Sequence, residues 1–139
     1  MNISMTNGRR LLAMTGASVL AMTVGTNAWA GSTAACVVGA GTDSTECGVG
    51  SQAQSADATA IGDDALASAK NSSAFGSSAQ ATGVNSTATG MVANAGGTGA
   101  SAYGAVSTAQ GNDSSAFGFN AGAFDIGASA FGSSATASG

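Results

Sequence analysis

Few residues of this chain could do chemistry, and their types do not combine into a catalytic set. The sequence contains no histidine, so the usual general base near neutral pH is missing. Asp63 and Asp64 are adjacent carboxylates, but neighbours on a strand point to opposite faces and cannot converge on one substrate. Gly96 to Gly99 resembles a phosphate-binding loop in glycine content alone, because no Gly-Lys-Ser or Gly-Lys-Thr follows. The sequence disfavours an enzyme and indicates no cofactor.

The two cysteines, Cys36 and Cys47, stand eleven positions apart. A disulfide between them is favoured if the chain is exported, because oxidising compartments preserve disulfides. Two free thiols are the alternative. A metal site would need further ligands, and there is no histidine to supply them.

Residues 1–30 have the layout of a secretory signal peptide. Arg9 and Arg10 precede an apolar stretch over residues 11–24, and Ala28-Trp29-Ala30 provides a small-residue cleavage site. The apolar stretch is too short to span a bilayer comfortably. The arginine pair raises the twin-arginine route, but the flanking residues favour general secretion.

The charge that remains after removal of residues 1–30 is acidic. Lys70 alone opposes seven carboxylates, which gives a formal charge of −6. Nucleic acids and anionic membranes are bound mainly through clustered lysine and arginine, so neither is an expected partner. No second long apolar run is present, and no membrane span is expected in the mature chain.

A 14-residue repeat occupies the sequence from Asp57 onward. Each copy has two alanines seven positions apart, a glycine two residues after the first alanine, and a residue between them that is large and apolar in five of six copies. The alanines are Ala60, Ala67, Ala74, Ala81, Ala88, Ala95, Ala102, Ala109, Ala116, Ala123, Ala130 and Ala137, and the glycines are Gly62, Gly76, Gly90, Gly104, Gly118 and Gly132. The intervening residues are Ile61, Phe75, Tyr103, Phe117 and Phe131, with Thr89 as the exception. A degenerate seventh copy begins at Glu46, and before it the register is lost.

A unit of this length is too short for two packed helices and is dense in glycine and serine, which favours short strands joined by tight turns. Because side chains alternate along a strand, each copy can point its two alanines inward from two successive strands. The sequence therefore predicts an all-β fold, a thin parallel β-solenoid with two strands per turn and turns stacked at strand spacing. The alanines are expected to line its interior, and the glycines to occupy its turns.

The outward faces of the two strands differ. The outward positions of the second strand are mostly polar, whereas the first strand carries the apolar ridge, which we define as Ile61, Phe75, Tyr103, Phe117 and Phe131. An exposed apolar patch usually marks a binding or self-association surface, and an alanine interior buries little apolar area. Identical chains are therefore expected to associate along the ridge. The alternative phase places the aromatic residues inside the roll.

Three copies carry a family resemblance: Asp57-Ala-Thr-Ala-Ile-Gly62, Asn71-Ser-Ser-Ala-Phe-Gly76 and Asn85-Ser-Thr-Ala-Thr-Gly90. They resemble the head repeats of YadA-like trimeric autotransporter adhesins of Gram-negative bacteria, over roughly residues 46–139. The resemblance implies a left-handed parallel β-roll that forms a homotrimer at the cell surface and binds extracellular-matrix proteins, host surfaces or sister cells. Together with the signal peptide indicated at residues 1–30, the chain is expected to divide into that signal peptide, a cap-like segment (31–45) and head repeats (46–139).

Two questions stay open from the sequence. Adhesins of this family continue into a coiled-coil stalk and a β-barrel anchor, whereas no apolar heptads or alternating membrane strands follow here, so we expect either a piece of an anchored outer-membrane adhesin or a secreted head-only relative. A self-assembling fibril component is the alternative function, because a stacked solenoid can recruit further copies at an open edge. An ice-binding solenoid is less favoured, since the threonines do not form one continuous ladder.

Overall fold

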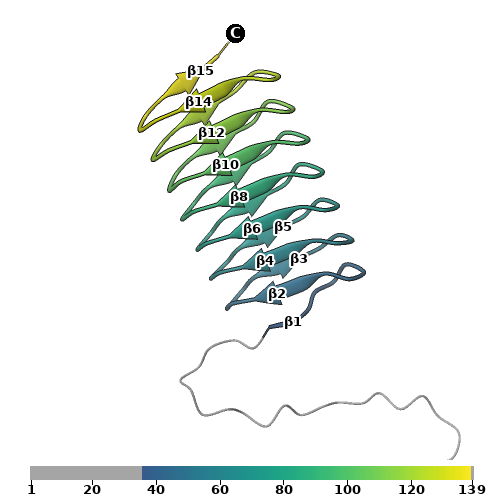
Figure 1. Cartoon of the computed structure of the whole chain (residues 1–139). Helices are drawn as coiled ribbons and strands as arrows, with labels where there is room; N and C mark the ends of the chain where they lie inside the picture. Colours follow the sequence, from purple (N-terminus) through teal and green to yellow (C-terminus); the bar gives the residue numbers. More distant parts are fainter. Residues whose placement is uncertain (1–35, 139) are drawn as a thin grey trace, which may run out of the picture.

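The structure, a computed structural model, describes residues 36–138, which form one elongated β-solenoid (Figure 1). The described residues contain strands, turns and bends but no helix, as the sequence predicts. Each 14-residue turn contributes one three-residue strand and one two-residue strand, and like strands of successive turns pair in parallel. The predicted signal peptide, residues 1–30, lies outside the described residues, as do the first five residues of the cap-like segment.

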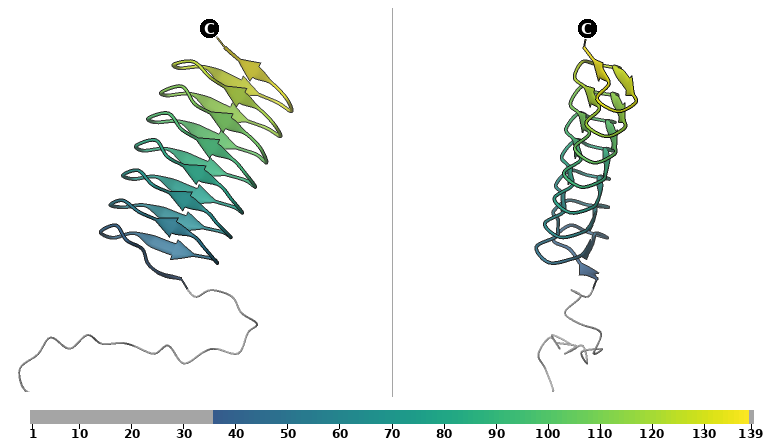
Figure 2. Two further views of the ribbon diagram at one scale, coloured as in Figure 1. Left: turned by 180° about the vertical axis from the view of Figure 1, so that it is seen from behind. Right: turned by 90° about the vertical axis from the view of Figure 1, so that its left-hand side faces the viewer.

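Two sheets run the length of the stack. The first sheet contains β1 (Val37–Val38), β2 (Thr45–Cys47), β4 (Thr59–Ile61), β6 (Ser73–Phe75), β8 (Thr87–Thr89), β10 (Ser101–Tyr103), β12 (Ser115–Phe117) and β14 (Ser129–Phe131). The second sheet contains β3 (Gln52–Ala53), β5 (Leu66–Ala67), β7 (Gln80–Ala81), β9 (Asn94–Ala95), β11 (Thr108–Ala109), β13 (Gly122–Ala123) and β15 (Thr136–Ala137). Viewed edge-on, the two sheets lie close together and the roll is thin (Figure 2).

The register is fixed by the repeat, so that each residue lies beside its equivalent in the next turn. Ala60 pairs with Ala74, and Ile61 pairs with Phe75. The ladder also reaches further back than the sequence indicated, because Thr45 pairs with Thr59 and the Asp57 amide donates to the Thr42 carbonyl. Register is maintained there because backbone hydrogen bonds set the stacking and do not require matching side chains.

Two corners connect the strands of each turn. The first corner leads into the first strand of a turn, as at residues 69–71 before β6. The second corner joins that first strand to the second strand of the same turn, as at residues 62–64 between β4 and β5. At the first corner a left-handed backbone conformation recurs, as at Asn71 and Asn85 with φ of 56° and 57°. Asparagine, aspartate and glycine tolerate this conformation best, and these three types fill the position in every described turn.

Candidate functional site

The interior of the roll is built almost entirely from alanine and serine. Of the twelve alanines that the repeat places inside, ten are fully buried, Ala130 is 3% exposed and Ala137, in the last turn, is partly buried. The largest fully buried side chains are four serines, Ser72, Ser86, Ser107 and Ser114. Two sheets this close leave no space for larger groups, so the aromatic residues are outside the roll and the alternative phase is not the one adopted.

The glycines of the repeat lie at the second corner, where successive turns approach each other closely. Gly76 has φ of 129°, and a Cβ added to it would lie 2.6 Å from the carbonyl oxygen of Gly90 in the next turn. The same close approach to the following turn recurs at Gly62, Gly90, Gly104 and Gly118, whereas Gly132 has open space beside it. These glycines therefore serve both the backbone conformation and the spacing of the stack.

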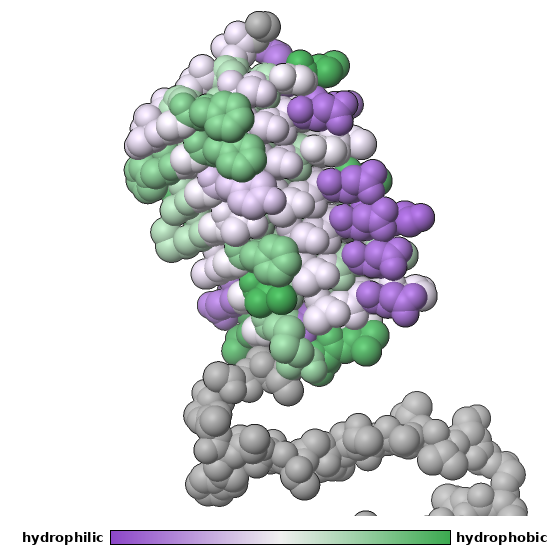
Figure 3. Space-filling view, in the orientation of Figure 1, coloured by the Kyte–Doolittle hydropathy of each residue, from purple (hydrophilic) through white to green (hydrophobic). Residues whose placement is uncertain are grey.

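The apolar ridge follows one column of the first sheet. Ile61, Phe75 and Tyr103 are 38%, 37% and 38% exposed, and Phe131 is 68% exposed. The Tyr103 and Phe117 rings are stacked with centroids 4.8 Å apart, and Phe117 is stacked on Phe131 at 5.2 Å. In-register pairing thus makes a continuous stack of three aromatic rings. Thr89 separates this stack from Phe75 and Ile61, and a row of apolar groups is visible along this face in Figure 3.

Beside the ridge runs a row of hydroxyl groups, one from each turn. Thr59, Ser73, Thr87, Ser101 and Ser115 are half-buried and occupy the other outward position of the first-sheet strands. Within residues 36–138, no outward side chain of either sheet is an acid, a lysine or an arginine. The ridge is therefore an apolar column on an uncharged face.

The charges are confined to the corners and to one inward position. Asp57, Lys70 and Asp113 lie at the first corner, and the exposed pair Asp63–Asp64 lies at the second. In Figure 3 the hydrophilic groups gather along one edge of the roll. Neighbouring turns also bond to each other at this edge, since the Asn71 side-chain amide donates to the Asn85 side-chain oxygen at 2.8 Å. A solvated corner suits these charged and polar groups, because they remain hydrated there.

The second corner carries exposed apolar side chains in three successive turns, which the repeat pattern alone does not indicate. Met91, Val92, Val106 and Phe119 are 56%, 47%, 39% and 60% exposed there. Val92 and Val106 adopt left-handed φ values of 58° and 60°, although a branched Cβ makes this conformation costly. The signal that could have found this patch is the presence of large apolar residues at turn positions where other copies have aspartate, asparagine or serine.

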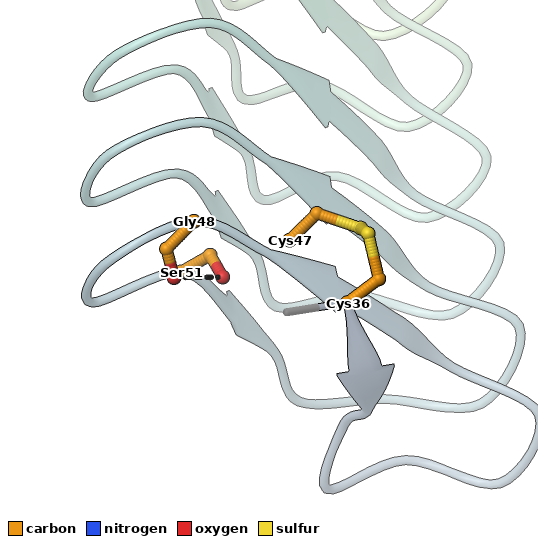
Figure 4. Close-up of a disulfide and its surroundings, with 4 residues drawn as sticks. All are labelled: Cys36, Cys47, Gly48 and Ser51. Atoms are coloured by element: carbon orange, nitrogen blue, oxygen red, sulfur yellow. Dashed lines mark hydrogen bonds between the residues drawn. A yellow bond between two sulfur atoms is a disulfide. The ribbon is translucent and has the colours of Figure 1, made fainter. Parts of the chain in front are cut away.

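A disulfide joins Cys36 to Cys47, with an S–S distance of 2.01 Å (Figure 4). Cys47 pairs with Ile61 in register, so the disulfide lies at the N-terminal end of the ridge column. It also ties the start of the described chain to β2, against which β1 pairs in the antiparallel direction. In the same turn, the Ser51 hydroxyl donates to the Gly48 carbonyl at 3.0 Å.

Glu46 closes the N-terminal end of the roll from the inside. It takes the inward position that alanine fills in the other copies, and its Oε1 accepts a hydrogen bond from the Ala53 amide at 2.7 Å. Ala53 lies in β3, the edge strand of the second sheet, and its carbonyl accepts from the Gly41 amide at 3.2 Å. Backbone groups that would be free at this edge are thus paired. The sequence shows the departure from alanine, but not its use as a cap.

Among the described residues, the features that recur from turn to turn are surfaces of the roll. Residues 36–138 include no group of three or more histidine, cysteine, aspartate or glutamate residues placed to bind a metal ion. They also contain no helix long and apolar enough to cross a membrane. What the fold repeats from turn to turn is an apolar column, a hydroxyl row and a polar edge, an arrangement suited to extended contacts with a macromolecule.

Comparison with protein-family models and with curated proteins found no match to this sequence.

Proposed function

We propose that this chain is the head of a bacterial adhesin, a non-catalytic homotrimer that is exported and attaches the cell or its secreted material to other surfaces. The observation that carries the proposal is the apolar ridge, and above all the stack of Tyr103, Phe117 and Phe131 on the outside of the roll. An aromatic column that is exposed in the single chain is typical of a surface that another molecule covers. The resemblance of the repeat to YadA-like heads supports three identical chains as the arrangement.

The interior supports association as well. Alanine side chains give little apolar area to bury, and hydrophobic stabilisation scales with that area at about 25 cal/mol per Å². The largest apolar side chains of the repeat are on the ridge, not in the core. Packing three ridges together would add the aromatic burial that the interior lacks, and the uncharged face around them would meet without repulsion between like charges.

The surfaces left outside such a trimer would carry the adhesive role. The outer face of the second sheet and the first corner are mostly polar, with Phe124, Val84 and Ile126 as exposed apolar exceptions, and both repeat with the period of the turns. Weak contacts that recur along the roll and in three chains multiply by avidity and need no deep pocket. The disulfide between Cys36 and Cys47 suits an oxidising compartment outside the cytoplasm, as the proposed export requires.

Fibre growth by head-to-tail stacking is the weaker proposal. Such growth needs the first turn of one copy to pair with the last turn of another. At the first turn, β1 pairs antiparallel with β2, and the Ala53 amide is already bonded to Glu46. The N-terminal end is therefore covered, and a parallel addition there would have to displace both contacts.

The experiment for the assembly is sedimentation equilibrium of the purified chain across a range of concentrations. The wild type should have the mass of a trimer independent of concentration, and a Phe75→Ser, Phe117→Ser variant should dissociate. Phe124→Ser is the matched control, because Phe124 lies on the outer side of the second sheet and is also exposed, at 43%. A folded wild-type monomer, or a double variant that keeps its mass, would refute the role given to the ridge.

The experiment for adhesion uses beads coated with the chain. Beads carrying wild type should attach to epithelial cells or to surfaces coated with laminin or fibronectin, or should aggregate with one another. Beads carrying the dissociated double variant at equal density should attach far more weakly, since avidity is lost. Equal attachment of bare beads and wild-type beads to every surface would refute the adhesive role.

A further inference from the structure

Two departures from the repeat occur in the same turn and fit each other. At the outward position of the second strand, the other described turns have a side chain, such as Gln80 or Thr108, whereas this turn has Gly122. Two residues later the other turns have small or polar residues, such as Thr82 or Gln110, whereas this turn has Phe124. One turn has thus lost a side chain and gained a ring at neighbouring positions on one face.

The Phe124 ring lies in the space that the missing side chain leaves. A Cβ added to Gly122 would lie 2.7 and 2.8 Å from two carbons of the ring, so the ring rests directly against the backbone of β13. Gly122 is buried as a result, while Phe124 keeps 43% of its surface exposed. One side of the ring therefore packs on the glycine, and much of the remainder faces solvent.

Neutral hydrogen-bonding side chains surround this ring on the same face. Thr108 and Thr136 pair in register with Gly122 from the turns on either side. Gln110 and Ser138 hold the positions equivalent to Phe124 in those turns and are exposed. Adjacent strands are about 4.8 Å apart, so these four groups lie within one or two ring widths of Phe124. None of them carries a charge.

We propose that Phe124 and its neighbours form a binding site for a neutral saccharide. A pyranose ring has one face of C–H groups and a rim of hydroxyls. The face of an aromatic ring carries partial negative charge and attracts such C–H groups, while burial of the apolar contact adds affinity. The rim would exchange hydrogen bonds with Thr108, Gln110 and Thr136, which both donate and accept. The described residues near the ring include no lysine or arginine, and the adjacent charged residue is the acid Asp125, so sialylated and sulfated sugars are disfavoured.

This inference names a ligand class for the proposed adhesive surface. The biological use of the site rests on the proposed adhesive role, whereas the binding of a saccharide to it does not. The second sheet is the face that the proposed trimer leaves open. A single shallow site of this kind would bind weakly, with a Kd on the order of millimolar. Three copies on one trimer would allow multivalent attachment to a glycan-coated surface.

The test measures binding of the full chain to four immobilised neutral probes: lactose, cellobiose, maltotriose and N,N′-diacetylchitobiose. Sialyllactose and sulfated lactose serve as charged counterparts. Phe124→Ser removes the ring. Gly122→Gln restores a side chain found at this position in other turns, so the Phe124 ring is still present but is displaced from its place on the sheet. Phe119→Ser is the matched control, because Phe119 is an exposed phenylalanine of the same turn that lies at the second corner.

We expect the wild type to bind at least one neutral probe, and both Phe124→Ser and Gly122→Gln to weaken that binding about tenfold or more, as loss of a central aromatic contact does. Phe119→Ser should bind as wild type, and all variants should keep the wild-type circular dichroism and mass. The site is refuted if no neutral probe binds below about 10 mM, if a charged probe is preferred, or if the two site variants bind as wild type. If beads coated with the wild type still attach to cells in that case, the adhesive role is retained and only this site is refuted.

Discussion

The close stacking of the second corner predicts that two chemically identical substitutions will differ sharply in cost. Gly76 and Gly132 hold the same place in the repeat and have similar φ values of 129° and 120°. A Cβ at Gly76 meets the next turn 2.6 Å away, whereas a Cβ at Gly132 meets nothing within 4 Å. Gly76→Ala should therefore combine backbone strain with a steric clash, and Gly132→Ala should have the strain alone.

The magnitude follows from these distances. Strain from a non-glycine residue at such a φ is about 1–3 kcal/mol in either variant. Ordinary contact for a Cβ begins at 3.4 Å, so relief of the clash at Gly76 requires the two turns to separate locally by about 0.8 Å. The hydrogen bond from the Gly90 amide to the Phe75 carbonyl is 2.8 Å long, and the bond from Val92 to Ser77 is 2.9 Å. That separation would break both, for about 2 kcal/mol more.

We thus expect Gly76→Ala to lower the free energy of unfolding by about 3–5 kcal/mol and Gly132→Ala by about 1–3 kcal/mol. Urea titration followed by circular dichroism gives both values, provided that the slope m is unchanged. Equal losses in the two variants would refute the reasoning, because backbone conformation alone would then account for these glycines. A larger loss for Gly132→Ala would contradict the register of the stack itself.

Three further changes test other parts of the roll. Ser86 Oγ is buried without a hydrogen-bond partner, whereas Ser72 Oγ donates to a carbonyl at 2.6 Å. In urea titrations Ser86→Ala should therefore be neutral or stabilise by up to about 1 kcal/mol, and Ser72→Ala should destabilise by about 1 kcal/mol; the reverse order would contradict this difference in hydrogen bonding. Glu46→Ala should cost about 1.5–3 kcal/mol through loss of the cap, and Glu46→Gln, which keeps an acceptor, should cost less; similar losses in both would place the effect elsewhere than in the hydrogen bond. Val106→Asn should raise the free energy of unfolding, measured by calorimetry, by up to about 1 kcal/mol, because the relief of left-handed strain exceeds the burial lost by a side chain that is already 39% exposed. A lower melting temperature would show that the valine contributes contacts.

The sequence predicted the fold in detail because a strict repeat reduces the problem to one turn. Once alanine recurs with the period of the turn, each turn must return Ala60, Ala74 and their equivalents to the same place, and in-register pairing follows. Alternation along a strand then places Ile61 and Phe75 outside. The all-β solenoid with its alanine interior is therefore confirmed, and association through the ridge stays a prediction.

Features that depend on departures from the repeat could not be predicted in the same way. Glu46 is visible as an odd residue, but its use as a cap depends on the free edge of β3, which only the three-dimensional stack reveals. Val106 sits in a conformation that its type disfavours, because the turns above and below impose it. The packing of Phe124 on Gly122 depends on the rotamer of one side chain, which the 14-residue repeat cannot predict.

The way in which this roll is stabilised explains why its outward departures are the best guide to function. Successive turns are joined by a ladder of backbone hydrogen bonds and by inward alanines, and neither depends on which side chain points outward. Outward positions away from the apolar ridge can therefore change at little cost in stability, whereas inward positions and the close-packed glycines cannot. Gln80 and Gly122 occupy the same outward position and pair equally well with their neighbours. Because the fold does not require Gly122 or Phe124, their pairing in one turn is more economically explained by what that face binds than by what the roll needs to fold.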